Sequence, residues 1–296
     1  MPTIDRHEIR FRSQDAECAA WLYTSGREKR PCVVLAHGFA GVRDQRLDDY
    51  AERFRACGWH AFVFDYRCFG ASDGMPRQLV SNRAQLEDWK AAVRYVRALE
   101  QVDPDRLVLW GTSTSGGHVL KLAASDRRIA AVVAQMPFAS GFAQLRMMRP
   151  TQGLRLLWAG LRDQVGSWLK RKPLLVPVAG RPYTPGVITT PDSLTGLALI
   201  TGPHSTWCNR VVARFALSTT FYNPGRDARR IGCPLLVCVA DGDALIARKP
   251  ALRVADRGEL RRYGCTHFEM YHGVGFERAV RDQIDFLRRA LAGVAA

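Results

Sequence analysis

The chain has 296 residues, close to the upper limit for a single hydrophobic core, so one large domain with an insertion or two modest domains are the natural choices. Hydrophobic residues make up 47% and charged residues 24%, and this ordinary globular composition excludes a disordered, collagen-like or coiled-coil protein. No uninterrupted run of 18 apolar residues occurs, so we expect no membrane-spanning helix. The first 20 residues carry scattered charges and lack the apolar stretch of a signal peptide, so we predict a cytoplasmic protein without a membrane partner.

The formal net charge of +15 comes mainly from arginine, because only six of the 43 basic residues are lysine. A basic surface can recruit anionic partners, but arginine scattered over solvated helix faces needs no function and is our default interpretation. The basic residues form only short clusters, such as 170–172, and no nucleic-acid recognition motif accompanies them, so we expect no nucleic-acid partner. The eight cysteines have neither C-x-x-C spacing nor a histidine at zinc-ligand spacing, so we predict no metal and no cofactor.

Short apolar runs alternate with amphipathic stretches along most of the chain. The predicted strands cover residues 8–12, 18–23, 32–36, 60–66, 107–110, 129–134, 235–240 and 259–263. The predicted helices cover residues 44–57, 81–101, a segment that begins near 115, and 276–292. Several of the strands are continuously apolar, which is typical of strands covered on both faces. The alternation therefore predicts an α/β fold with a mostly parallel, doubly wound sheet.

Residues 138–230 interrupt this alternation and are rich in proline. We predict that they form a partly helical cap, inserted into a core that consists of residues 1–137 and 231–296. Within the cap, apolar residues recur at helical spacing with charged residues between them, which predicts one amphipathic helix. The apolar positions are Leu154, Leu157, Trp158, Leu161, Val165 and Trp168, and the charged positions are Arg155, Arg162 and Asp163. Such a cap would cover the carboxyl edge of the sheet, where open α/β sheets bind ligands.

The stretch from Leu107 to His118 is the most informative part of the sequence. A strand runs into a turn of small residues and then into a helix, with Ser113 at the apex of the turn. The strained backbone of such a turn crowds the residues two before and two after the serine, so both must be small, and here they are Gly111 and Ser115. The following helix points free N–H groups and its positive end at the serine. A rival frame with Ser115 at the apex stays open, although it would extend the strand through residues of poor strand propensity.

With this turn in place, the chain resembles the α/β-hydrolase superfamily. The features that carry the resemblance are, in chain order, His37-Gly38-Phe39, the turn around Ser113, Asp243 and His267. Serine, acid and histidine follow one another in the superfamily order. Residues 37–48 and 64–70 are similar to one subgroup, which contains dienelactone-hydrolase-like esterases and the thiohydrolases and acyl transferases that release polyketide chains in fungal gene clusters. The resemblance implies a catalytic triad.

A serine hydroxyl is a poor nucleophile at neutral pH and needs a base, together with a carboxylate that orients the base. The base is expected between the last strand and the terminal helix, where His267 lies, with His272 as the alternative. The superfamily pattern G-x-x-D, laid on residues 240–243, implies that Asp243 is the acid, with Asp241 as the alternative.

An oxyanion hole requires two backbone N–H donors that point at the developing negative charge. One is the N–H of Thr114, which follows the serine, and the resemblance implies that the other is the N–H of Phe39. Six large apolar residues of the cap either line a substrate pocket or pack the cap onto the core. They are Phe138, Phe142, Met147, Met148, Trp158 and Trp207.

These features predict a serine hydrolase that cleaves a carboxylic ester or thioester through an acyl-enzyme, without metal or cofactor. The expected partner is a small-molecule or carrier-bound acyl substrate. The runner-up is an acyltransferase that passes a polyketide or other acyl group to an alcohol or amine. A peptidase that acts on small amides and a non-catalytic binding protein on the same fold stay open as the third and fourth functions.

Overall fold

One eight-stranded sheet organises the computed structural model, which describes residues 6–293; the outermost residues of the predicted core, 1–5 and 294–296, lie outside this range. In spatial order the strands are β1 (Arg6–Ser13), β2 (Ala16–Tyr23), β4 (His60–Phe64), β3 (Arg30–Ala36), β5 (Val102–Thr112), β6 (Ile129–Gln135), β9 (Leu235–Ala240) and β10 (Glu259–Tyr263). The sheet is parallel from β4 to β10, and β1 and β2 extend it antiparallel. The predicted α/β fold with a mostly parallel sheet is confirmed.

The central strands are apolar on both faces because both faces are covered. Every residue of β4, β6 and β9 is buried. β5 begins earlier than the sequence predicts, because Val102 already pairs with Arg30, and a register shift then separates this pair from the pair of Leu107 with Cys32. Residues 103–105, which lie between the predicted helix 81–101 and the predicted strand 107–110, are thus an irregular part of β5.

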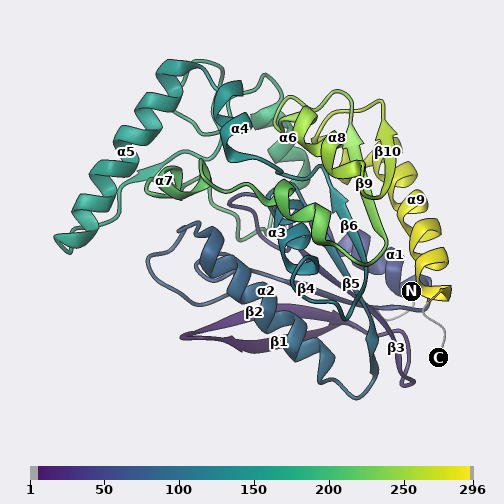
Figure 1. Cartoon of the computed structure of the whole chain (residues 1–296). Helices are drawn as coiled ribbons and strands as arrows, with labels where there is room; N and C mark the ends of the chain where they lie inside the picture. The colour runs from purple at the N-terminus through teal and green to yellow at the C-terminus, as the bar shows by residue number, and fades with distance from the viewer. Residues whose placement is uncertain (1–5, 294–296) are drawn as a thin grey trace.

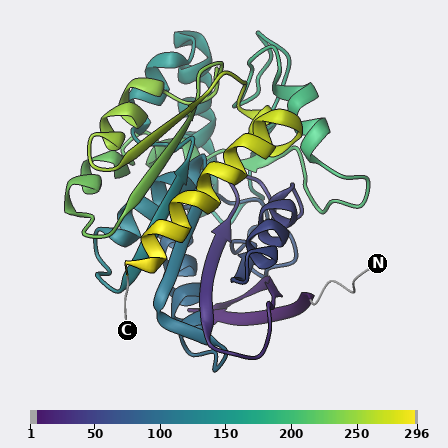
Figure 2. The same cartoon turned by 90° about the vertical axis from the view of Figure 1, so that its right-hand side faces the viewer.

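Helices cover the two faces of the sheet (Figures 1 and 2). The helices α1 (Leu47–Ala56) and α9 (Gly273–Ala292) pack on one face, where Tyr50 and Phe276 contact each other. The helices α2 (Asn82–Arg97), α3 (Thr114–Ala123) and α8 (Arg248–Ala255) pack on the other face. The sheet therefore carries a hydrophobic core on each side, as its two-sided apolar strands require.

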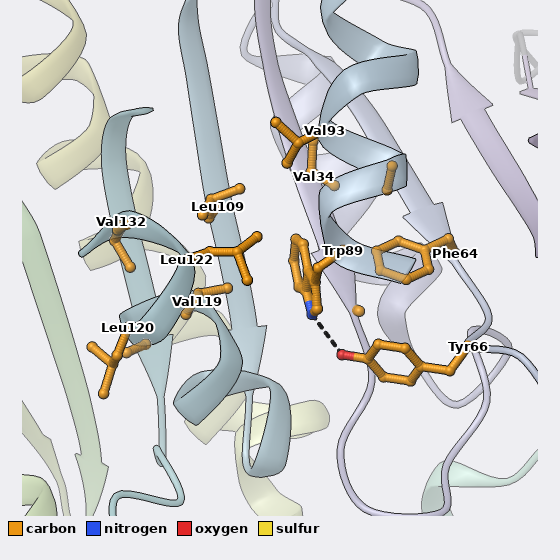
Figure 3. Close-up of a cluster of buried hydrophobic side chains, with 14 of the residues drawn as sticks. Val34, Phe64, Tyr66, Trp89, Val93, Leu109, Val119, Leu120, Leu122 and Val132 are labelled. Atoms are coloured by element: carbon orange, nitrogen blue, oxygen red, sulfur yellow. Dashed lines mark hydrogen bonds between the residues drawn. The ribbon is translucent and has the colours of Figure 1, made fainter. Parts of the chain in front are cut away.

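Trp89 of α2 is at the centre of the second core (Figure 3). Its ring is fully buried and meets Phe64 of β4 edge to face, with ring centroids 5.1 Å apart. Its Nε1–H donates to the hydroxyl of Tyr66 over 2.6 Å. This hydrogen bond satisfies the one polar group of the indole, which would otherwise be costly to bury.

Residues between β6 and β9 form a mainly helical segment. Its elements are α4 (Gly141–Met147), α5 (Pro150–Trp168), β7 (Leu175–Val176), α6 (Ser193–Ile200), β8 (Val211–Val212), α7 (Phe215–Thr219) and the 3₁₀ helix η1 (Pro224–Arg230). A second 3₁₀ helix, η2 (Phe268–Tyr271), precedes α9. In Figure 1, α4, α5 and α7 lie beyond the sheet, on the side from which α3 begins.

The predicted amphipathic helix of this segment is α5. Its apolar face points mainly to the outside of the protein, however, whereas the apolar pattern suggests that this face is buried. Trp158 is 69% and Trp168 is 73% exposed, whereas Asp163 is buried. Asp163 accepts a hydrogen bond from the N–H of Leu174 over 2.6 Å and pairs with the Nε of Arg214 at 3.3 Å. Trp158 therefore neither packs the segment onto the core nor lines a pocket, and that expectation is wrong.

No helix in the part of the chain that the structure describes is both long and apolar enough to cross a membrane.

Candidate active site

Ser113 occupies the sharp turn between β5 and α3 with φ 55° and ψ −116°, a strained conformation for a residue with a side chain. Its backbone N–H donates to the carbonyl oxygen of Gln135 over 2.8 Å, and its own carbonyl oxygen accepts from the N–H of Phe138 over 2.8 Å. A Cβ atom at Gly111 would lie 2.2 Å from the carbonyl oxygen of Ser115, so only glycine fits there. The neighbouring strand and the glycine together hold Ser113 in the turn.

Ser115, the alternative apex, points into the core. It is fully buried, its hydroxyl donates to the carbonyl oxygen of His37 over 2.5 Å, and it is hydrogen-bonded to the hydroxyl of Tyr66. The turn therefore tolerates serine where glycine is usual, because this side chain fills a space with two polar partners. Ser113, in contrast, lines the cavities described below.

Asp243 and His267 form the second half of the candidate site. The Nδ1 of His267 lies 2.7 Å from the Oδ2 of Asp243, and the Oδ1 of Asp243 accepts from the N–H groups of Leu245 and Ile246 over 2.7 and 3.0 Å. Burial acts to raise the pKa of Asp243, but His267 and these hydrogen bonds outweigh burial, so the pKa lies below its ordinary value. The ionised carboxylate holds the imidazole with Nε2 free.

The structure places the alternative acid and base elsewhere. The carboxylate of Asp241 pairs with Arg262 at 2.7 Å on the surface, and its side chain is 35% exposed. His272 stands before the first turn of α9 and lines a separate surface hollow with Cys265 and Asp282. Neither residue lines a cavity with Ser113.

Two adjoining hollows meet at Ser113. The smaller, of about 60 Å³, is lined by both Ser113 and His267, together with Gly38 and Phe39. The larger, of about 570 Å³, opens between the Ser113 turn and the segment that contains α4 and α5, and Phe39 and Thr114 also line it. Its volume is that of a pocket for a small organic ligand.

The predicted oxyanion donors both lie beside Ser113. Thr114 is the first residue of α3, so its N–H is one of the amides that a helix leaves free at its N-terminus. Phe39 follows Gly38, and a Cβ at Gly38 would lie 3.0 Å from the Cβ of Ser113, which shows how closely this loop approaches the serine.

Three of the six predicted pocket residues line the large cavity, namely Phe138, Met147 and Met148. The other three do not. Phe142 and Trp158 are exposed, and the indole Nε1–H of Trp207 donates to the carbonyl oxygen of Ala40 over 3.0 Å, which ties its loop to the core.

Several residues that shape the site carry no signal in the sequence. Leu156 and Val187 also line the large cavity, as does Leu157, which the sequence marks only as an apolar position of a helix. Gln144 of α4 joins the inserted segment to the loop after Asp243, because its Nε2 donates to the carbonyl oxygen of Leu245 and its Oε1 accepts from the N–H of Ala247. A lone glutamine in a helix has no pattern that predicts such a long-range contact.

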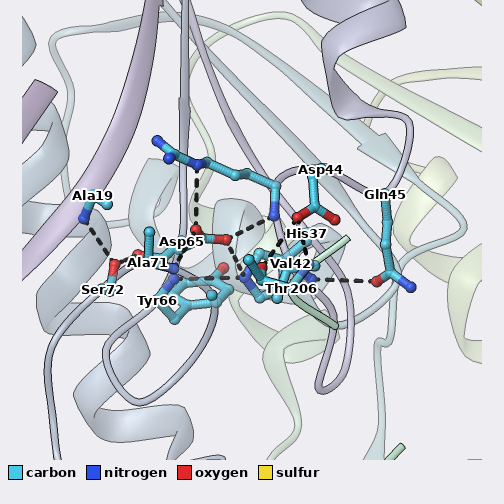
Figure 4. A network of polar contacts seen from close by, with 12 residues as sticks. Ala19, His37, Val42, Asp44, Gln45, Asp65, Tyr66, Ala71, Ser72 and Thr206 are labelled. Atoms are coloured by element: carbon cyan, nitrogen blue, oxygen red, sulfur yellow. Dashed lines mark hydrogen bonds and ion pairs between the residues drawn. The ribbon is translucent and has the colours of Figure 1, made fainter. Parts of the chain in front are cut away.

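A buried polar network supports the loop that carries Phe39 (Figure 4). Asp65 accepts from the N–H of Arg43 over 2.7 Å and from that of Ala71 over 3.1 Å, and the Nε of Arg43 lies 3.3 Å from it. Burial raises the pKa of Asp65 to about 6, although Arg43 and these hydrogen bonds act to lower it. His37 is buried beside this network, and burial lowers its pKa to about 4, so the imidazole is neutral at pH 7.

His118 on α3 links the nucleophile helix to the inserted segment. Its Nδ1 lies 2.6 Å from the hydroxyl of Tyr222, and its Nε2 lies 3.1 Å from the Oε1 of Gln85. An amide oxygen only accepts, so Nε2 carries the proton and Nδ1 accepts from the tyrosine. Burial, followed by the charge of His37, lowers the pKa of His118 to about 3.

A pH dependence of stability follows from His118. Because its folded pKa of about 3 lies below the unfolded value of about 6.5, the unfolded chain binds the extra proton between these values, and stability falls as the pH falls through this window. Between pH 7 and pH 5 this residue is expected to cost about 2 kcal/mol. Because the pKa of buried His37 is lowered as well, the loss that His118 causes is measured as the difference between the wild type and His118→Gln in urea unfolding at both pH values. His118→Gln keeps a donor and an acceptor but cannot titrate, so a variant with the same loss as the wild type would contradict the assignment.

Among residues 6–293, no group of three or more His, Cys, Asp or Glu side chains is arranged to hold a metal ion.

The fold and the arrangement of this site define the class of protein: the chain belongs to the α/β-hydrolase family. Residues 27–196 match the family described as serine aminopeptidase, S33. The quorum-quenching protein AidA of Acinetobacter baumannii is 46% identical over 286 residues, which cover 95% of this chain and 94% of that protein. A polyketide transferase of Aspergillus fumigatus is 25% identical to this chain. The aligned region covers 97% of this chain and 99% of that protein. The crystal structure of the α/β hydrolase GrgF from Penicillium matches with a TM-score of 0.81 at 24% identity, over 97% of this chain and 99% of that one, and supports the fold alone.

Proposed function

We propose that the protein is a serine hydrolase that cleaves a carboxylic ester or thioester through an acyl-enzyme. In this proposal Ser113 is the nucleophile, His267 the general base and Asp243 the acid that orients it. One observation carries the proposal: Ser113, in a strained turn, lines the same small cavity as a histidine whose Nδ1 is held by a buried carboxylate at 2.7 Å.

In the first half of the reaction, the Oγ of Ser113 attacks the carbonyl carbon while Nε2 of His267 takes the hydroxyl proton. The bond to the leaving alkoxide or thiolate breaks, and His267 returns the proton to that group. A water molecule then attacks the acyl-enzyme, gives its proton to His267 and releases the carboxylic acid as the proton returns to Ser113. Asp243 keeps the proton on Nδ1 throughout, so that Nε2 is the atom that exchanges it.

The negative charge on the carbonyl oxygen is stabilised by the N–H groups of Phe39 and Thr114, which adjoin Ser113 in the same cavity. Donors of this kind contribute about 3–4 kcal/mol each to the transition state in related chemistry. The N-terminal end of α3 adds a positive dipole at the same point.

The lining of the large cavity supports an apolar acyl group as the part of the substrate that binds there. Leu145, Met148 and Leu156 are among the residues that line it. Burying each methylene of an acyl chain contributes about 0.8 kcal/mol, so a chain that fills the cavity gains substantial binding energy. A lactone is a cyclic ester that the same residues can open, so acylated lactones belong in the test together with linear esters and thioesters.

A second candidate function is transfer of the acyl group to an alcohol or amine in place of water. The similarity to a polyketide transferase favours acyl transfer over a binding protein without catalysis. Hydrolysis and transfer use the same acyl-enzyme and differ only in the acceptor. Analysis of the products formed with and without alcohol or amine acceptors distinguishes them, because transfer gives a new ester or amide at the expense of the free acid.

The proposed function is tested by a panel of p-nitrophenyl esters, acyl-pantetheine thioesters, acylated lactones and small anilides with graded acyl chains. We expect hydrolysis of the esters or thioesters, with kcat/KM rising with chain length until the cavity is filled. Turnover of the anilides alone would instead indicate a peptidase, as the name of the matching family suggests.

A larger side chain in the cavity is expected to shorten the acyl chain that the enzyme prefers. Leu157 lines it, so Leu157→Trp is expected to lower kcat/KM for the longest accepted ester about tenfold or more while leaving acetate esters nearly unchanged, because overpacking excludes only the distal methylenes. Leu161→Trp is the matched control, because Leu161 lies on the outer side of the same helix and is 50% exposed. Equal chain-length profiles for both variants would show that the acyl chain does not bind in this cavity.

A further inference from the structure

The outer face of α5 is apolar and uncovered. Its exposed apolar side chains, together with that of the residue after the helix, form a set that we call the α5 stripe: Leu154, Trp158, Leu161, Val165, Trp168 and Leu169. They recur at the spacing of one helix face and are between 48% and 73% exposed. Contiguous apolar surface of this kind marks a binding surface in a folded protein rather than part of its core.

The surroundings of the α5 stripe are strongly basic. Residues 138–191 contain eight Lys and Arg and one acid, Asp163, which is buried and paired with Arg214. Arg155 and Arg162 are exposed beside the stripe, and 170–172, all basic and exposed, directly follow the helix. Basic residues thus border apolar ones, and no exposed acid in this segment offsets their charge.

We propose that the α5 stripe docks onto the surface of an anionic phospholipid bilayer. The tryptophan and aliphatic side chains enter the interfacial layer, and the basic residues beside them contact lipid phosphates. Helices that lie in a membrane interface combine these two features, namely Trp and Leu on one face with Lys and Arg at its border. This proposal replaces the expectation from the sequence that the chain has no membrane partner.

The basic residues beside the stripe argue against a second copy of the chain as the partner that covers it. Two stripes packed against each other would bring Arg155 and Arg162 of both copies together without an exposed acid of the same segment to pair them. The position of α5 also leaves the stripe accessible to a bilayer, because the helix lies at the margin of the molecule and its C-terminal end projects from it (Figure 1).

The opposite side of α5 gives the docking a consequence for the proposed function. Leu156 and Leu157 line the large cavity, so a docked helix would hold the cavity next to acyl compounds dissolved in the bilayer. The docking itself does not depend on what the cavity binds, and it can be measured without any substrate.

Co-sedimentation with vesicles tests the proposal. The wild-type chain is expected to bind vesicles of phosphatidylcholine and phosphatidylglycerol about tenfold or more tightly than vesicles of phosphatidylcholine alone, and less at about 1 M than at about 0.1 M salt. Leu161→Ser combined with Trp168→Ser is expected to lower binding about tenfold or more. The matched control is Phe221→Ser, because Phe221 is 81% exposed outside the stripe, and its binding should equal that of the wild type.

The basic residues are tested in the same way. Arg171→Gln with Lys172→Gln is expected to weaken binding to the anionic vesicles several-fold, whereas Arg278→Gln with Arg281→Gln on α9 is not. Hydrolysis of a water-soluble acetate ester is expected to be unchanged in every one of these variants, which separates the docking from the proposed function.

Four results would overturn the proposal. The first is an absence of binding to anionic vesicles, and the second is equal binding by the wild type and the stripe variant. The third is a dimer, seen by light scattering without vesicle binding, that the stripe substitutions dissociate, because a second copy would then cover α5. The fourth is saturable binding to an acidic carrier protein in place of vesicles, because a protein would then be the partner of α5.

Discussion

Replacing Ser113 with alanine is expected to lower kcat for ester hydrolysis about a million-fold, because the members of a catalytic triad act as a unit and loss of the nucleophile removes the acyl-enzyme route. Folding should be preserved, because Ser113 is held through its backbone N–H and carbonyl groups, which alanine retains. Steady-state kinetics with the best ester of the panel, together with the thermal unfolding temperature, measure both expectations.

Ser115→Ala is the matched control, two residues away in the same turn. It removes the partner of the His37 carbonyl and of the Tyr66 hydroxyl, both buried, so it is expected to cost about 1–3 kcal/mol of stability. Most of the activity should remain at a temperature where the variant is folded. If Ser115→Ala were inactive and Ser113→Ala active, the assignment of the nucleophile would be wrong.

Asp243→Asn is expected to lower kcat about ten-thousand-fold, because an amide in place of the carboxylate favours the wrong imidazole tautomer and does not stabilise the imidazolium. The backbone N–H groups of Leu245 and Ile246 hold the other carboxylate oxygen, so the side chain at 243 should keep its position in the variant. The pH dependence of kcat/KM, compared with that of the wild type, reports the change in the histidine directly.

Asp241→Asn is the control for the acid. It breaks only a surface ion pair with Arg262, and such pairs contribute about 0–1 kcal/mol, so activity and stability should change little. Comparable losses of activity in the two variants would contradict a single acid at Asp243 and would indicate that both carboxylates act on the site.

The parallel sheet could be predicted because its signal is local. Strands such as β3 and β6 are short, continuous apolar runs, and both are almost entirely buried. The turn around Ser113 could be predicted for a similar reason, since steric crowding restricts the residues near the apex. In the structure, the requirement for a very small residue holds strictly only at Gly111, where a Cβ would collide with the backbone of Ser115. Position 115 itself accepts a side chain.

The inserted segment could not be predicted in the same way, because its contacts join residues far apart in the sequence. Periodicity shows that the two sides of α5 differ, but not which side the rest of the protein covers. The buried side is set by the Asp163–Arg214 pair, 51 residues apart, and by small residues such as Gly160 that allow close packing. The same limit applies to Gln144, whose contacts with the loop after Asp243 span about a hundred residues.

Mass spectrometry of the covalent intermediate is the most direct test of the central claim that Ser113 carries the acyl group. The protein is mixed with a good ester substrate, quenched in acid and digested with trypsin. The peptide 107–121 contains both Ser113 and Ser115, so fragmentation must locate the adduct within it. We predict one acyl group on Ser113, absent from Ser113→Ala and retained in Ser115→Ala. An acyl group on Ser115, or turnover of the ester with no acylated serine in this peptide, would contradict the account.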